Sequence, residues 1–203
     1  VADDTSATGR FIISWLIGGS DYSIRRWFFH FDTSSLDDAS TISSAVFSLA
    51  GEGTAETNTN SSSIYIVQST TTSANQIVSG DYNKAGSTSF ASMLLANWVQ
   101  TDWTYNDFTL NASGISNISK TGVSKFATRD GRDFDNLAPT GLNTAYCHFA
   151  DQTGTSKDPK LVITYTVVVW PANLKSYNTN LSANIKSIDT NLIANVKSLN
   201  TNV

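Results

Sequence analysis

A densely charged segment gives this sequence its clearest candidate site for chemistry. Residues 129–135 read Arg-Asp-Gly-Arg-Asp-Phe-Asp. Closely spaced carboxylates on a glycine-containing loop can supply the hard oxygen ligands that calcium prefers. Asp130, Asp133 and Asp135 therefore form a candidate calcium site, and calcium is the one cofactor that the sequence suggests. Two arginines lie in the same segment and can neutralise these carboxylates, so the alternative is a solvated, salt-bridged loop without metal.

A second candidate site consists of aromatic residues in the polar stretch Asn97–Asn106. Trp98, Trp103 and Tyr105 carry flat rings, and exposed rings that stack on sugars are the usual physical basis of carbohydrate binding by β-sandwiches. Large aromatic side chains are more often buried than exposed. The sequence thus predicts either a platform for a polysaccharide or ordinary core residues at these three positions.

Residues suited to catalysis or to a transition metal are few. Glu52 and Glu56 are the only glutamates and share one loop, whereas glycosidase-type chemistry needs two carboxylates facing each other. Asp residues from different loops could still form such a pair. His30 and His148 are scattered without zinc-ligand spacing, and Cys147 lies in an apolar segment where a thiol acts as a small hydrophobe. We expect a protein that is not an enzyme.

The composition favours an extracellular β-protein. Hydrophobic residues make up 40% of the 203 residues and aromatic residues 11%, which is enough for a core. Charged residues make up only 15%, against roughly 25% in an average soluble domain. The polar surface must therefore come mainly from Ser, Thr and Asn. This balance is typical of secreted and cell-surface β-proteins.

Charge and apolar runs exclude two kinds of partner. The net charge of −4 argues against nucleic acid, which needs a clustered basic surface. The longest apolar runs, Phe11–Ile17 and Leu161–Trp170, are far shorter than the roughly 20 residues of a membrane helix. No signal peptide is visible at Val1, so we expect a cytosolic or an already processed secreted chain and favour the second.

The pattern of apolar residues predicts an all-β fold, an antiparallel, jelly-roll-like β-sandwich over residues 1–169. Trp27, Phe29 and Phe31 show the alternation expected of a strand inside a sandwich. Ser113–Ala127 has mostly helical spacing and predicts the one short helix, with Ser113 as its N-cap and Gly122 ending or interrupting it. Ala85–Trp98 fits a strand or a helix. Segments separated by Ser, Thr, Gly and Asn loops predict strands at Phe11–Ile17, Ser23–Asp32, Ala45–Ala50, Ser63–Ser69, Asn106–Asn111, Thr144–Asp151 and Lys160–Val169.

Residues 170–203 have a different character. Pro171 blocks continuation of a paired strand, and an 11-residue repeat starts at Asn173, Asn184 and Asn195. The 3-4-4 spacing of its apolar residues is that of a right-handed coiled coil. Half of residues 172–203, 16 of 32, are Asn, Ser, Thr or Asp, and this favours extended segments joined by Asn-Thr-Asn turns. The apolar residues expected to mediate assembly are Leu174, Tyr177, Leu181, Ile185, Ile188, Leu192, Val196 and Leu199.

Such a thin repeat cannot bury its apolar face without a partner, and a neighbouring copy of the chain is the simplest one. We therefore expect a homo-oligomer or polymer that assembles through this tail.

Three segments resemble a known family. Residues 25–36 (Arg-Arg-Trp-Phe-Phe-His-Phe-Asp-Thr-Ser-Ser-Leu), residues 39–49 and the closing segment Asp158–Tyr165 resemble the core of DNRLRE-type secreted modules. The resemblance spans roughly residues 11–166. It implies a β-sandwich from a secreted or surface protein, and some members of that family act as carbohydrate-binding modules. Fold by itself does not fix function.

The sequence departs from that family at its start. Family members usually have an additional strand ahead of the segment equivalent to Phe11–Ile17, and here only the mostly polar residues 1–10 precede it. A sandwich without one strand has an open edge that invites pairing. A strand-compatible segment of the tail of the next copy could fill that edge, as in donor-strand complementation.

Two functions remain in competition. The first is a non-catalytic structural subunit of an extracellular fibre or surface appendage that self-assembles through residues 170–203. The alternative is a carbohydrate-binding module of a secreted or surface protein.

Overall fold

The computed structural model describes residues 6–54, 57–58 and 61–167. The chain divides into two units, Val1–Thr166 and Val167–Val203, and all described strands and helices belong to the first. The eight apolar residues predicted to mediate assembly, from Leu174 to Leu199, lie outside the described residues.

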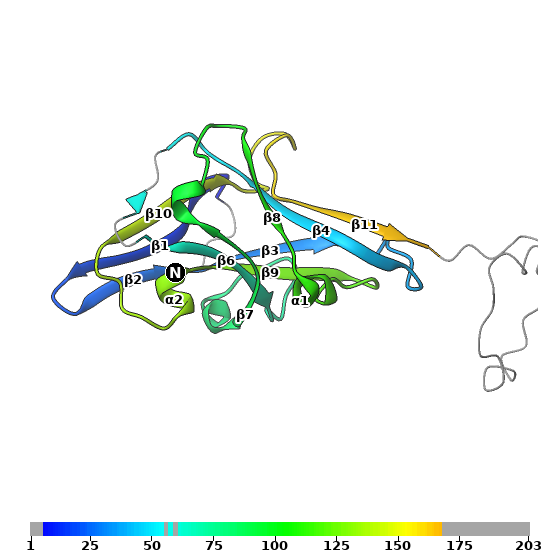
Figure 1. Cartoon of the computed structure of the whole chain (residues 1–203), viewed down its shortest axis with the longest axis horizontal. Helices are drawn as coiled ribbons and strands as arrows, with labels where there is room; N and C mark the ends of the chain where they lie inside the picture. Colours follow the sequence, from blue (N-terminus) through cyan, green and yellow to red (C-terminus); the bar gives the residue numbers. More distant parts are fainter. Residues whose placement is uncertain (1–5, 55–56, 59–60, 168–203) are drawn as a thin grey trace, which may run out of the picture. The chain divides into compact units, whose positions relative to one another are not determined.

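The first unit is an antiparallel all-β sandwich, as the sequence predicts (Figure 1). Its strands form three sheets, in the orders β2-β1-β10-β5, β11-β4-β8 and β3-β9-β6-β7. The described strands are β1 (Thr8–Gly18), β2 (Asp21–Arg25), β3 (Trp27–Asp32), β4 (Thr41–Ala50), β5 (Thr57–Asn58), β6 (Ser63–Ser69), β7 (Ala85–Leu94), β8 (Tyr105–Thr109), β9 (Val123–Asp130), β10 (Leu142–His148) and β11 (Lys160–Thr166). The helices are α1 (Ala112–Ser116), α2 (Gly131–Phe134) and the 3-10 turns η1 (Ser79–Lys84) and η2 (Leu95–Asn97).

The core lies between the sheet of β3, β9, β6 and β7 and the sheet of β11, β4 and β8. Phe47 on β4 is fully buried at its centre. Its ring meets those of Phe29, Phe31, Phe108 and Phe126 at centroid distances of 5.3, 5.7, 6.2 and 5.8 Å. Edge-to-face and tilted contacts of this kind add to the free energy of burial. Five aromatic rings from four strands therefore hold the two sheets together.

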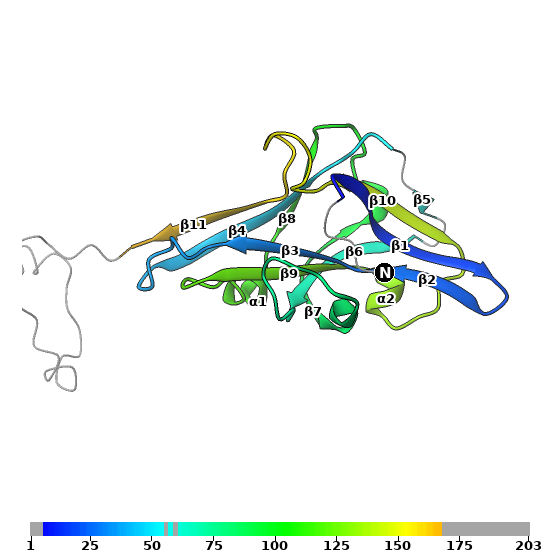
Figure 2. The same cartoon turned by 180° about the vertical axis from the view of Figure 1, so that it is seen from behind.

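The third sheet continues the sandwich beyond this aromatic core. A single bridge between Gly51 and Cys147 links the end of β4 to β10. Cys147 is fully buried, and burial raises the pKa of its thiol well above the ordinary value. The expectation of a structural cysteine is thus confirmed. Figure 2 shows β1, β2 and β10 on one side of the molecule and β4, β8 and β11 on the other.

The expected strand Ser23–Asp32 is interrupted at Arg26. Residues before Arg26 form β2, which pairs with β1, and residues after it form β3, which pairs with β9. The chain therefore passes from one sheet to another at this residue. The predicted alternation within β3 is confirmed, because Phe29 is buried and Trp27 and Phe31 pack against the core on the same face.

The prediction of a helix over Ser113–Ala127 is wrong for most of that segment. Only α1 is helical there, and its N-cap is Asn111, whose side chain accepts a hydrogen bond from the Gly114 amide at 3.0 Å. Residues from Val123 onward belong to β9. They pair with β3 on one side and with β6 on the other, and two ladders of backbone hydrogen bonds outweigh helical spacing.

For one further segment the structure settles an open choice, and for another it differs from the predicted loop. The undecided segment Ala85–Trp98 forms β7 followed by η2. A second short helix, α2, lies inside the charged segment that was expected to be a loop. Its N-cap is Asp130, which accepts a hydrogen bond from the Arg132 amide at 2.9 Å.

The aromatic core generates the first testable prediction. Replacing Phe47 with alanine should lower the free energy of unfolding by about 3–5 kcal/mol, because a large cavity would form among four rings. Chemical denaturation of the two proteins measures this difference. Leu137→Ala is the control, since Leu137 is exposed and its loss should change stability by less than about 0.5 kcal/mol. Equal effects of the two substitutions would contradict this account of the core.

Candidate functional site

A groove of about 1060 Å³ runs beside β3. Its size is that of pockets that bury a small ligand or a short peptide segment. Both faces of β3 contribute to its wall, so the groove follows the edge of this strand. Most of its lining side chains are aromatic or aliphatic: Ile24, Trp27, Phe28, Phe29, Phe31, Ile77, Val78, Tyr82, Phe149, Ala150 and Pro159.

The groove coincides with an open side of the sandwich. Among the described strands, β3 pairs only with β9, and β11 in the facing sheet pairs only with β4. Asp158 and Pro159, directly before β11, line the same groove as β3. The opposite side of the sandwich is covered, because α1 contacts both β7 and β4 there. One side of the sandwich is therefore closed, and the other presents an aromatic edge strand beside a groove.

His30, which lines the groove, and Lys125 are both hydrogen-bonded to the segment Thr71–Ala74. His30 on β3 lies 2.7 Å from the Ala74 carbonyl oxygen through Nδ1 and 2.9 Å from the Thr71 hydroxyl through Nε2. A carbonyl can only accept, so Nδ1 carries the proton and Nε2 accepts in the neutral ring. Burial, helped by nearby Lys125, lowers the pKa of His30. Lys125 donates to the carbonyls of Thr71 and Thr72, which fixes the same segment to β9.

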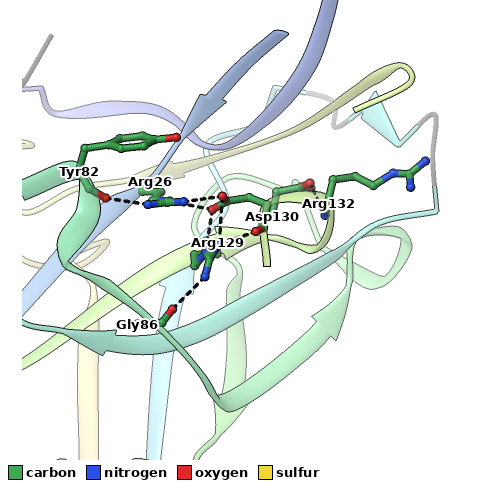
Figure 3. Close-up of polar contacts among 7 residues, drawn as sticks. Arg26, Tyr82, Gly86, Arg129, Asp130 and Arg132 are labelled. Atoms are coloured by element: carbon green, nitrogen blue, oxygen red, sulfur yellow. Dashed lines mark hydrogen bonds and ion pairs between the residues drawn. The ribbon is translucent and has the colours of Figure 1, made fainter. Parts of the chain in front are cut away.

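Arg26 lines the groove at the junction of β2 and β3 and belongs to a buried ion-pair network (Figure 3). Arg26 donates through Nε and Nη2 to the two carboxylate oxygens of Asp133 at 2.8 and 2.6 Å. Its Nη1 donates to the Tyr82 carbonyl at 2.9 Å, and its guanidinium lies 4.3 Å from the centre of the Tyr82 ring. Arg129 also donates to both oxygens of Asp133, at 2.8 and 3.1 Å, and to the Gly86 carbonyl at 3.1 Å.

This network determines the charge of Asp133. The residue is only 4% exposed. Burial by itself raises the pKa of its carboxyl, but the hydrogen bonds from Arg26 and Arg129 outweigh burial and hold the pKa below its ordinary value. The same bonds to Asp133 raise the pKa of Arg26. Bidentate pairing of this kind is both strong and geometrically specific.

The three carboxylates of the candidate calcium site face different partners. The Asp133 carboxylate forms ion pairs with two arginines. Asp130 is buried and accepts a hydrogen bond from the Ser62 hydroxyl at 2.7 Å. Burial raises the pKa of Asp130 despite hydrogen bonds from Ser14 and Ser62. Asp135 is exposed. In the part of the chain that the structure describes, no three His, Cys, Asp or Glu side chains gather where they could hold a metal ion. Calcium binding stays a prediction. The geometry favours the alternative without metal, in which carboxylates of this segment pair with arginines, but these ion pairs are buried and not solvated.

The three aromatic residues predicted to form a sugar platform differ in their exposure. Trp98 is 4% exposed and belongs to the core, so its assignment to an exposed platform is wrong. Tyr105 is partly buried, and its hydroxyl donates to the carbonyls of Ser156 and Asp158 at 3.0 and 2.9 Å. Trp103 is 57% exposed. Of the three aromatic residues, Trp103 alone has the exposure that stacking on a sugar requires.

Polar side chains surround Trp103. Its backbone has a φ of 71°, in the left-handed region that non-glycine residues seldom adopt. The Lys157 amine lies 3.8 Å from the centre of the ring and donates to both oxygens of Asp102 at 3.1 Å. Asp102 Oδ1 is also 2.7 Å from His148 Nε2, and hydrogen bonds from His148 and then Lys157 lower the pKa of Asp102. An exposed ring thus lies next to a carboxylate and an amine.

Sequence reasoning missed the groove and the role of Arg26. The adjacent pair Arg25–Arg26 before an aromatic strand was the available signal, because an arginine at the start of a buried strand needs a carboxylate partner. The partner, Asp133, is 107 residues away in the chain.

The ion-pair network generates the second prediction. Asp133→Asn should lower the free energy of unfolding at pH 7 by about 3–5 kcal/mol, because two buried guanidinium groups would lose their counter-ion. The lowered pKa means that the carboxylate stabilises the wild type above the ordinary value of 3.8 and loses this effect as the pH falls through the lower folded value. The difference between the two proteins should therefore narrow below about pH 4.

Denaturation at several pH values measures this difference. Asp135→Asn removes a carboxylate from an exposed position of the same segment and serves as the control. A difference between wild type and Asp133→Asn that does not change with pH would contradict the proposed role of the charge.

No family model, no curated protein and no solved structure matches this chain. The resemblance to DNRLRE-type modules stays a prediction. None of the helices in the described ranges is long and apolar enough to cross a membrane.

Proposed function

We propose that this chain is a non-catalytic structural subunit of an extracellular filament or surface appendage and that it assembles with other copies through residues 170–203. The observation that carries the proposal is the open aromatic edge of β3 beside the groove. Proteins normally protect edge strands with charges, prolines or covering segments, because a bare edge pairs with other chains. An aromatic edge strand beside a groove is instead suited to receive a further strand.

The chain also contains segments suited to pair with such an edge. Two short stretches of the repeat, Leu181–Ile188 and Leu192–Leu199, each lie between two polar Asn/Asp-Thr-Asn triplets. A repeat of this composition has too few apolar residues to form a core of its own. One chain therefore contains both an acceptor edge and donor segments. The donor segment of one copy can bind the edge of the next, and a head-to-tail interface of this kind generates filaments when it does not close into a ring.

The engagement of two polar side chains that line the groove supports a binding role rather than a catalytic one. Arg26 is tied to Asp133, and both ring nitrogens of His30 are engaged with the neighbouring loop. Side chains that act as acids, bases or nucleophiles need a free atom directed at the substrate. The low share of charged residues supports an extracellular setting.

Deletion of the tail tests the proposed assembly. The full chain should form regular filaments in negative-stain electron micrographs, and a chain lacking residues 172–203 should remain monomeric in analytical ultracentrifugation, because the donor segments are gone. The truncated protein should keep the melting temperature of the sandwich, since residues up to Thr166 form a compact unit. Filaments that persist after the deletion would contradict the proposal, as would a full chain that never assembles.

A second candidate function is carbohydrate binding, and the observation that favours it is the exposed ring of Trp103 beside Asp102 and Lys157. Sugar rings stack on exposed aromatic faces, and carboxylate and amine groups can bind the sugar hydroxyls.

Trp103→Ala tests this second function. If the site binds a polysaccharide, the variant should lose at least about 1 kcal/mol of binding free energy, which is roughly a fivefold weaker affinity. Retention on affinity gels that contain insoluble or soluble polysaccharides measures the effect. Trp15→Ala is the matched control, because Trp15 is an exposed tryptophan on β1. Equal retention of wild type and Trp103→Ala would exclude this platform.

A further inference from the structure

We infer that the groove beside β3 is the acceptor site for one extended segment of the 11-residue repeat from a second copy of the chain. The inference rests on the proposed function and adds to it the place on the sandwich where the tail binds. In this arrangement the donor segment adds a strand to the free edge of β3, and alternate side chains enter the groove.

The length of the repeat fits the length of the edge. The groove follows the chain from Arg25 to Phe31, and seven extended residues span about 23 Å. In the central repeat, the stretch Leu181–Ile188 lies between the triplets Asn178–Asn180 and Asp189–Asn191. Its eight residues span about 26 Å when extended. One repeat can therefore cover the edge, and the polar triplets then lie beyond its ends, where turns are favoured.

The side-chain pattern of that stretch fits the groove as well. Leu181, Ala183 and Ile185 alternate with Ser182 and Asn184. Because successive side chains of a strand point to opposite faces, one face of residues 181–185 is apolar and the other is polar, and in the rest of the stretch Ser187 follows on the first face and Ile188 on the second. The apolar face matches the aromatic lining of the groove, and the polar face would remain in solvent.

The number of repeats favours a second copy over the chain's own tail. The chain contains two donor stretches between polar triplets, Leu181–Ile188 and Leu192–Leu199, whereas β3 has one free edge in the described part of the sandwich. One stretch is left over when the other is bound. The remaining stretch is available to the groove of another copy, and this is the arrangement that links subunits into a polymer.

Disulfide cross-linking between two differently labelled full-length chains tests the inference. The native Cys147 is fully buried, so introduced thiols are the reactive ones. One chain carries Val78→Cys in the groove wall, where Val78 is 51% exposed, and the other carries Leu181→Cys or Ile185→Cys in the tail. Oxidation of the mixture should yield a disulfide-linked pair of the two chains, because thiols that can be bridged must lie within about 7 Å between Cα atoms.

A matched control separates the groove from the rest of the surface. Leu137 is 49% exposed and does not line the groove, so Leu137→Cys has the same accessibility at a different place. The yield of linked chains with Val78→Cys should exceed the yield with Leu137→Cys about tenfold or more. Ser79→Cys, also exposed on the groove wall, replaces Val78→Cys if that variant does not fold.

Three outcomes of the cross-linking experiment would contradict the inference, and they differ in what they say about the proposed function. Equal yields for Val78→Cys and Leu137→Cys in a wild type that forms filaments would overturn the acceptor site and leave the proposed assembly intact. A chain with both Val78→Cys and Ile185→Cys that cross-links within itself at high dilution, with no link between chains, would also overturn the inference, because the tail would then fill its own groove. A full chain that forms neither filaments nor links would overturn the proposed function together with the inference.

Discussion

The ion pair between Arg26 and Asp133 is the constraint on which the functional side of the molecule depends. Arg26 marks the point where the chain leaves the sheet of β1 and β10 and enters the sheet of β9 and β6. Asp133 holds it there together with Arg129 at the end of β9. Arg26 also donates to the Tyr82 carbonyl, and this hydrogen bond fixes the loop that forms one wall of the groove. Two sheets and one loop are thus positioned by a single buried carboxylate.

Aromatic residues occur both in the interior of this sandwich and along its open edge, and they have different roles in the two places. Phe47 and its four neighbouring rings bury their surface between two sheets and account for the cohesion of the fold. On the open side, Trp27 stacks on Phe149 at 4.2 Å, and both residues line the groove as well as contributing to the core. Aromatic surface beside an unpaired strand edge provides apolar contacts and backbone hydrogen-bonding groups together. A strand from another chain can use both.

Local patterns in the sequence predicted the class of fold and parts of it in detail. The alternation of Trp27, Phe29 and Phe31 placed one face of β3 on the core, and the apolar setting of Cys147 placed the thiol in the interior. The helix expected over Ser113–Ala127 was mostly wrong, because β9 pairs on both sides and this pairing is not visible in local spacing. For the candidate sites, Trp103 is exposed as a sugar platform requires, whereas Trp98 is buried.

The sequence by itself determined that this is an all-β protein with a repeated, polar C-terminal segment, because period-two alternation and an 11-residue period are properties of neighbouring residues. Only the tertiary structure decided that Asp133 pairs with Arg26, that β3 is an edge and that a groove lies beside it. These facts depend on which strands become neighbours, and Arg26 and Asp133 are 107 positions apart. Strand order is set by the free energy of the whole fold, so no local pattern reveals an open edge.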